Sequence, residues 1–441
     1  MSIKWIKRSG LNPQAILDRI DSIKRISSDG RISYSGFEYH EIFASLFSLL
    51  DVPTSISTEV DMDSLVSKAL GQAAQAGPLT KEGILKRLND VAKNELSTRE
   101  IEYALLTSIS MGTTLPFRRL NLESVVIKAI NGPFPKKYDS RNSIIKPKQE
   151  KLSLNHHNYT KIIISTKAKS FRGAATKALN AIDLARSFAS LFANSSMELM
   201  GSAYAPINKI RLGQVHTLHL PSGKAATGLF WYDPNFSEAK AYEHKNPETL
   251  KKHFHWCLKQ LDRCPYQVTL KEGLLRYVRS LDESDHNSAA IKLWGALEAL
   301  ASPGDARYDK IVKRCSFLFA EVDYHYQILE HLREFRNRSI HAGDQSERAK
   351  TFCYQMQFYF RELVLFHLSN AGSFKNIEDK RFLGFADRCR CPFGSKKTGN
   401  QSPSIPENRV ELSLEVEWER LKPFSHPFAR NLYPPFGHTI A

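Results

Sequence analysis

The chain has 441 residues, 42% of them hydrophobic, which is enough for two or three folded domains and excludes a disordered chain. Its formal net charge of +16 attracts polyanions, so nucleic acid and anionic membrane surfaces are the candidate partners. Charge alone does not choose between them.

The sequence predicts a cytoplasmic protein without membrane association. Residues 1–7 reach polar positions at once and lack the apolar stretch of a secretory signal. Apolar runs such as residues 363–368 are far shorter than the about 20 residues needed to cross a bilayer. The six cysteines are scattered along the chain, which is typical of a reducing compartment.

Residues 1–135 predict a helical accessory region in which we find no chemical motif. Apolar residues follow the candidate N-cap Thr80 with helical spacing. Ser97 followed by Glu100 is typical of a capping box and predicts another helix over residues 98–108. We expect this region to act as a sensor for a regulatory partner.

A basic segment follows the turn residues at 132–135 and predicts a domain boundary. Its six cations are opposed by only two acids and are Lys136, Lys137, Arg141, Lys146, Lys148 and Lys151. The ordinary interpretation is a solvated linker. The alternative is an arm that contacts RNA, with Lys146 and Lys148 binding substrate, although the segment lacks the interleaved aromatic residues of a stacking platform.

Residues 136–265 predict a domain of mixed α and β structure. The β-branched run at residues 162–164 is typical of a buried strand, and residues 171–191 have helical apolar spacing. Residues 215–220 and 228–232, joined by a turn, predict a β-hairpin.

Residues 266–370 predict an antiparallel helical bundle. Asn246 with Pro247 starts a helix to about residue 261. Thr269 and Glu272 form a capping-box signal for the next one. Further helices are expected over residues 270–281, 289–301, 308–320, 326–341 and 347–368, and residues 371–441 form an extended tail. The fold class expected is therefore α+β, predominantly α.

The residues best suited to chemistry lie late in this bundle, in the run Arg336-Asn337-Arg338-Ser339-Ile340-His341. Asn337 and His341 are one helical turn apart, and Arg336 is next to Asn337. Gly343 is the kind of residue that ends a helix in the left-handed conformation, which places His341 in the final turn.

These residue types suit metal-independent cleavage of RNA. Histidine ordinarily titrates near neutrality and can move protons, and arginine binds phosphate bidentately while staying charged. Asn337 can orient either the imidazole or the ribose. The motif contributes one histidine per chain, which is too few for both acid and base, so we expect a symmetric homodimer in which two copies of the motif face each other.

The pattern of Arg336, a polar residue, a short spacer and His341 at the end of a late bundle helix resembles the HEPN superfamily. Trp294 and Glu298 on a preceding helix resemble its Apea-like branch. The resemblance covers roughly residues 269–368, and more loosely the region from residue 159. The first part of the chain lies outside it.

The resemblance implies a dimeric endoribonuclease that needs no metal or cofactor, of a kind common in toxin and anti-phage systems. A phage-derived trigger acting at residues 1–135 would fit such a role. Arg336 and His341 would be catalytic and Asn337 supportive. Glu298 would either face the site or pair with an arginine such as Arg336. Arg338 would support the catalytic residues, and Arg333 would bind the substrate.

Two alternatives remain open for the motif. It is also typical of an ordinary charged helix end, and the same bundle could bind RNA or a nucleotide as a dimeric sensor or scaffold without turnover. The ribonuclease is favoured because of the bundle context.

Two groups of candidate metal ligands are weaker. His253 and Cys257 share a helical face, with His255 and Cys264 nearby in sequence, but two good ligands do not make a zinc site. Near the C-terminus, Cys389 and Cys391 resemble half of a small SEC-C zinc motif, whose second ligand pair is absent unless His426 or His438 folds back. We therefore expect a protein without a metal site.

Overall fold

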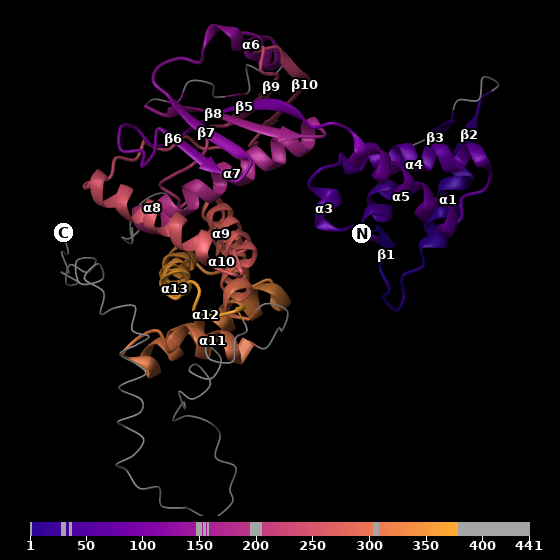
Figure 1. The fold of residues 1–441 in the computed structure, drawn as a ribbon. Helices are drawn as coiled ribbons and strands as arrows, with labels where there is room; N and C mark the ends of the chain where they lie inside the picture. The colour runs from indigo at the N-terminus through magenta and orange to yellow at the C-terminus, as the bar shows by residue number, and fades with distance from the viewer. Residues whose placement is uncertain are drawn as a thin grey trace, which may run out of the picture. The chain divides into compact units, whose positions relative to one another are not determined.

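The computed structural model describes residues 2–27, 32–34, 38–146, 152, 156, 158–194, 205–302 and 308–377. The chain divides into two compact units. Of the described residues, the first unit contains those within 1–109, 117–182 and 212–236, and the second contains those within 110–116, 183–211 and 237–377. Figure 1 shows the course of the chain through its helices and strands.

The first unit begins with a small helical part that has its own core. Its helices are α1 (Pro13–Ile23), α2 (Glu38–Ser48), α3 (Thr54–Ser57), α4 (Met62–Ala76) and α5 (Lys81–Ser97). Two short strand pairs accompany them: β1 (Lys4–Trp5) with β4 (Leu50–Asp51), and β2 (Lys24–Ile26) with β3 (Ile32–Tyr34). The Thr80 side chain accepts a hydrogen bond from the Gly83 backbone, which confirms the predicted cap of α5.

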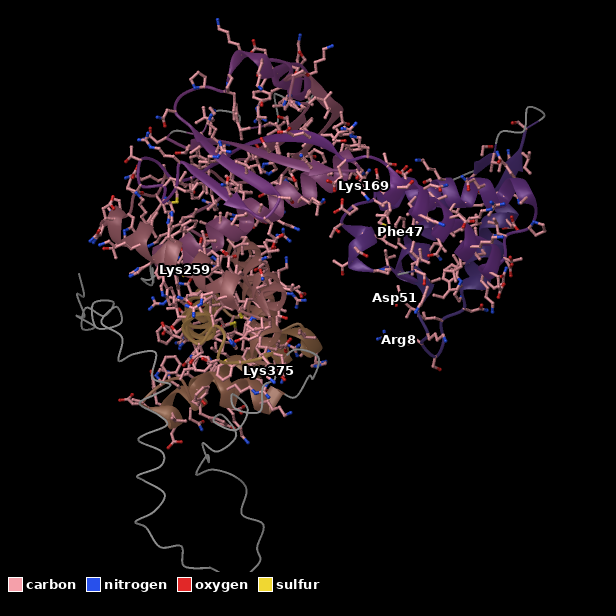
Figure 2. All side chains as sticks on the ribbon, in the orientation of Figure 1. Arg8, Phe47, Asp51, Lys169, Lys259 and Lys375 are labelled. Atoms are coloured by element: carbon pink, nitrogen blue, oxygen red, sulfur yellow. The ribbon has the colours of Figure 1, made fainter. Side chains whose placement is uncertain are left out.

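A six-stranded antiparallel sheet forms the rest of the first unit. In spatial order its strands are β10 (Ala225–Tyr232), β9 (Val215–His219), β5 (Ile101–Ile109), β8 (Thr160–Ala168), β7 (Val125–Ile130) and β6 (Arg119–Leu122). The helix α7 (Phe171–Ala193) follows β8, and the short helices η1 (Lys136–Tyr138) and α6 (Ser140–Ile145) lie between β7 and β8 in sequence. Lys169, labelled in Figure 2, donates a hydrogen bond to the Leu96 backbone and so links the sheet region to α5.

The predicted helix over residues 98–108 is wrong. Ser97 is the last residue of α5, and its hydroxyl donates back to the Asn94 carbonyl instead of capping a new helix. Residues 101–109 form β5, a central strand paired with β8 on one side and β9 on the other. Pairing on both edges outweighs a local capping signal, because every backbone group of a buried segment needs a partner. The strands β6 and β7 also lie within residues 1–135, for which the sequence predicted a helical region.

The predicted strand at residues 162–164 is confirmed as the middle of β8, and the predicted hairpin is confirmed as β9 and β10. The basic segment from residue 136 follows β7 and precedes β8, and these two strands pair in one sheet. Gly223 in the hairpin turn has a φ of +93°, and an added Cβ would lie 2.1 Å from the Lys137 backbone oxygen. Only glycine allows this close approach of the hairpin to η1.

The second unit is helical and centres on α10 (His286–Ala301). This helix contacts α9 (Gln267–Leu281), α11 (Tyr308–Ser316), α12 (Val322–Ala342) and α13 (Ala349–Ser369). Trp294 and Leu297 of α10 are fully buried. The helix α8 (Pro247–Arg263) starts as predicted, with the Asn246 side chain accepting from the Thr249 backbone. The chain is thus α+β, with helices more abundant than strands. None of the described helices is long and apolar enough to span a bilayer.

Several helix limits in this unit differ from prediction, including the start of α12, which is Val322 and not residue 326. The helix α9 starts at Gln267 after Tyr266, which makes no side-chain cap, so Thr269 lies inside the helix and is not its cap. The helix α11 ends at Ser316, before the predicted limit of residue 320. Local capping signals indicate that a helix exists more reliably than they indicate its first residue.

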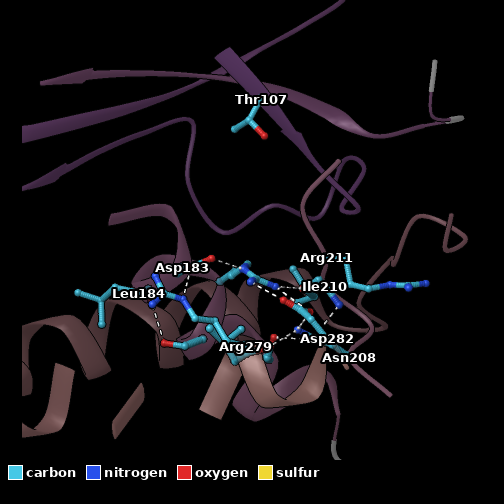
Figure 3. Close-up of polar contacts among 12 residues, drawn as sticks. Thr107, Asp183, Leu184, Asn208, Ile210, Arg211, Arg279 and Asp282 are labelled. Carbon is cyan, nitrogen blue, oxygen red and sulfur yellow. Dashed lines mark hydrogen bonds and ion pairs between the residues drawn. The ribbon is translucent and has the colours of Figure 1, made fainter. Parts of the chain in front are cut away.

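An ionic network centred on the buried Arg186 joins the C-terminal half of α7 to α9 (Figure 3). The Arg186 guanidinium lies 2.8 Å from the Asp183 carboxylate and 2.6 Å from that of Asp282. Arg279 also pairs with Asp183, at 2.8 Å, and the Asn208 amide donates to Asp282 at 2.8 Å. Each charge of this network has a partner, as buried charges require.

Candidate functional site at the end of α12

The predicted motif occupies the last two turns of α12. Gly343 ends the helix with a φ of +71°, and its backbone N–H donates to the Arg338 carbonyl. The predicted left-handed stop is therefore confirmed, and His341 lies in the final turn.

One face of α12 is fixed by apolar packing. Leu329, Leu332 and Phe335 are buried, and the Phe335 ring lies 4.8 Å from that of Phe352 on α13. Arg336 follows Phe335 directly, so its side chain leaves the helix at the edge of this packed face. Only 14% of the Arg336 side chain is exposed.

Polar contacts with Asn337 and Glu298 position Arg336. One of its terminal nitrogens donates to Asn337 Oδ1 at 3.1 Å, and the other lies 3.6 Å from Glu298 Oε1 on α10. The same Glu298 oxygen accepts a hydrogen bond from Trp294 Nε1 at 2.8 Å. Glu298 thus forms the arginine pair that the sequence left open, and it fixes the guanidinium between α10 and α12.

His341 is in a different environment. It is exposed, one helical turn after Asn337, and no described residue forms a hydrogen bond with its imidazole. The neighbouring Ile340 is 46% exposed. Five positions separate His341 from Arg336, which corresponds to about 7.5 Å along the helix axis and roughly 140° around it. One chain therefore presents the two groups on different sides of its helix.

The other predicted residues are dispersed. Arg333 pairs with Glu330 at 2.6 Å, and Arg338 is an exposed side chain near Glu334 and Asp344, at 3.9 and 3.7 Å. Lys146 is exposed at the end of α6 in the first unit. Lys148 lies outside the described residues.

The candidate zinc ligands of α8 do not assemble. Across the described ranges, no three His, Cys, Asp or Glu side chains lie where they could share a metal ion. Cys257 is buried, and burial raises the pKa of its thiol, which opposes the thiolate form that zinc needs. Burial lowers the pKa of His253, whose ring packs 5.0 Å from that of Phe192. Cys389, Cys391, His426 and His438 lie outside the described residues.

No family model, curated protein or solved structure matches this chain. In the sequence, Trp294 contributed to the resemblance to the Apea-like branch, and its contact with Glu298 was not predicted. Trp294 is buried, but its indole N–H also orients Glu298. The helical spacing of four between these residues was the available signal.

Proposed function

We propose that the helical unit is a metal-independent endoribonuclease of the HEPN type, with α12 as its working element. The observation that carries the proposal is the end of this helix, where a guanidinium fixed by Asn337 and Glu298 precedes an exposed imidazole in the last turn. The resemblance of the motif to the HEPN superfamily supports the same assignment.

In the proposed reaction, one His341 imidazole removes the proton from a ribose 2′-hydroxyl. The 2′-oxygen then attacks the adjacent phosphorus, and the bond to the 5′-oxygen breaks. A second, protonated imidazole gives its proton to that leaving oxygen. The products are a 2′,3′-cyclic phosphate and a free 5′-hydroxyl. Arg336 donates to the phosphate oxygens as negative charge builds on them.

The second imidazole is proposed to come from another copy of this chain. A single chain offers one exposed histidine in the motif, on a different side of α12 from Arg336. A symmetric dimer through the helical bundle places two copies of the motif opposite each other and supplies an acid and a base together. Ile340, exposed beside His341, adds apolar surface for such a contact.

One observation favours a second candidate function. Arg336 is largely buried and paired with Glu298. Such an arginine can serve to stabilise the bundle instead of binding a substrate. In this alternative, the unit is a dimeric module that binds RNA or a nucleotide without turnover.

Incubation of the purified protein with labelled tRNA and total RNA in EDTA separates the two functions. The ribonuclease predicts cleavage that persists in EDTA and is lost in His341→Ala. The matched control is His331→Ala, which removes another exposed histidine from the same helix. RNA binding without cleavage under any condition would support the binding module instead.

The resemblance also supports a cytoplasmic role in a toxin or anti-phage system. Expression is then expected to slow the growth of the host cell, and His341→Ala is expected to relieve the effect. Equal toxicity of both proteins would count against this role.

A further inference from the structure

One face of the sheet of the first unit is packed, and the other carries cations around a small core in which Ile163, Leu106 and Tyr138 are buried. Ile162 and Ile164 point to the packed face and are fully buried, and Figure 1 shows α7 along this side of the sheet. Strand register places alternate residues on the other side. Arg119, Lys128 and Lys161 lie there, and we call this side, with Arg141 of α6, the basic face.

Two exposed cations stand next to each other at one end of the basic face. Arg119 on β6 is the register partner of Lys128 on β7. Like charges directly opposite on paired strands destabilise the pairing. Among the described residues, no carboxylate forms an ion pair with either one, so an external anion would relieve their repulsion.

A second pair of cations lies further across the same face. Arg141 donates to the Thr217 hydroxyl at 2.7 Å and to the Val215 carbonyl at 3.2 Å, both on β9. Its pKa falls to about 10 because burial penalises the charged form. Burial, and then the nearby Arg141, lower the pKa of Lys161 on β8.

The side chains of this second pair share one aromatic ring. The Arg141 guanidinium and the Lys161 ammonium each lie 5.3 Å from the centre of the Phe134 ring. No ion pair with a carboxylate is formed by Arg141 or Lys161 in the part of the chain that the structure describes. An anion bound near both of these half-buried charges would offset their mutual repulsion.

Aromatic side chains border the basic face at its other end. Phe230 and Tyr232 on the edge strand β10 are the register partners of Thr217 and Val215, the two residues that Arg141 contacts. Their rings lie 5.8 Å apart, and Tyr232 is 40% exposed. The segment that carries Arg141 also contacts β10. The strand β10 thus places two further aromatic rings near Arg141.

We propose that the basic face binds single-stranded RNA, with phosphates at Arg119, Lys128 and the Arg141–Lys161 pair and with a base stacked on Tyr232. Six strands about 4.8 Å apart span roughly 24 Å from β6 to β10, enough for several nucleotides. Between these two ends the RNA would pass over η1 and α6, which cover the middle strands on this side. Cations that bind phosphates together with an exposed ring that can stack on a base fit a single strand better than a lipid surface. The proposal goes beyond the cleavage reaction and does not depend on it.

The test measures binding of the full chain carrying His341→Ala, so that cleavage cannot affect the result. The probe is a fluorescein-labelled 12-nucleotide RNA without secondary structure, followed by anisotropy over a range of salt concentrations. Adding Arg119→Ser and Lys128→Ser is expected to weaken binding about tenfold and to lower the salt slope by about 1.4, since each contact to a single strand contributes about 0.7. The matched control, Lys86→Ser with Lys93→Ser on α5, removes the same charge from exposed positions elsewhere and is expected to change binding less than twofold.

Tyr232→Ser tests the stacking contact and is expected to weaken RNA binding at least fivefold. Polyglutamate of similar length and vesicles containing phosphatidylserine are tested in parallel. The proposal is overturned if the Arg119 and Lys128 double variant binds RNA as the Lys86 and Lys93 control does. It is also overturned if Tyr232→Ser has no effect, or if binding to polyglutamate or vesicles falls while RNA binding is retained.

Discussion

Arg336 and His341 belong to one motif but have different physical situations. Arg336 is largely buried beside Phe335 and is fixed by Glu298 and Asn337, whereas His341 extends from the last turn of α12 into solvent. A change at Arg336 therefore affects the fold and the proposed chemistry together, and a change at His341 affects the chemistry alone.

This contrast predicts different effects on stability. Arg336→Ala leaves the Glu298 carboxylate without its cation and should lower the free energy of unfolding by about 1–2 kcal/mol. His341→Ala removes an exposed side chain and should change it by less than about 0.5 kcal/mol. Urea unfolding followed by circular dichroism measures both. Equal losses for the two variants would contradict the different environments assigned to these residues.

His367 on α13 gives the fold a pH dependence. It is fully buried 3.1 Å from the Tyr266 hydroxyl, and burial lowers its pKa to about 4, against the opposing effect of a hydrogen bond with the Leu300 backbone. The unfolded chain, with an ordinary histidine pKa of about 6.5, binds more protons between these values. The contribution of His367 to stability is therefore fully present above pH 6.5 and is lost as the pH drops toward 4, by on the order of 3 kcal/mol in total.

The measurement is urea unfolding at several pH values for the wild type and for His367→Gln, which keeps a polar side chain that does not titrate. The variant should lose most of the slope between pH 6.5 and 4. His341→Ala, which removes an exposed histidine, should keep it. An unchanged slope in His367→Gln would show that other groups cause the acid sensitivity.

At the scale of elements, local signals predicted the helices better than the strands. Asn246 with Pro247 and Thr80 mark true helix starts, and Gly343 marks a true helix end, because capping is decided within a few residues. Residues 101–109 carried a helical signal but form β5, because partners more than 50 residues away complete its hydrogen bonds. Such pairing is not visible in a local pattern.

The network around Arg186 predicts a large effect from one substitution between elements. Arg186→Met preserves much of the volume but leaves Asp183 and Asp282 without their shared cation, which should cost about 3–5 kcal/mol. The control is Arg276→Met, which breaks a pair with Glu272 between half-exposed side chains and should cost about 0.5 kcal/mol or less. Denaturant unfolding compares them, and similar midpoints for the two variants would show that the network contributes little.

At the scale of the whole molecule, the sequence predicted the class of fold and the motif but not how distant residues combine. The position of His341 at a helix end follows from the motif and Gly343. The pairing of Arg336 with Glu298 was one of two interpretations, because a spacing along the chain does not fix which helices touch. The basic face was not predicted, since Arg119, Arg141 and Lys161 come together only through strand order and a short helix.

The proposed dimer predicts that RNA cleavage depends on protein concentration. If the acid and base come from two chains, the rate per chain should fall as the protein is diluted below its dimer dissociation constant. Sedimentation equilibrium gives that constant independently of activity. A rate per chain that stays constant when the protein is monomeric would show that one chain is sufficient.

The central claim is that α12 cleaves RNA by attack of a 2′-hydroxyl, with His341 moving the protons. The most direct test is analysis of the product ends after incubation in EDTA, using RNA and the same sequence with 2′-O-methyl groups throughout. We expect 2′,3′-cyclic phosphate and 5′-hydroxyl ends from RNA, no cleavage of the methylated strand, and loss of both ends in His341→Ala but not in His331→Ala. Cleavage of the methylated strand, or undiminished cleavage by His341→Ala, would contradict this account.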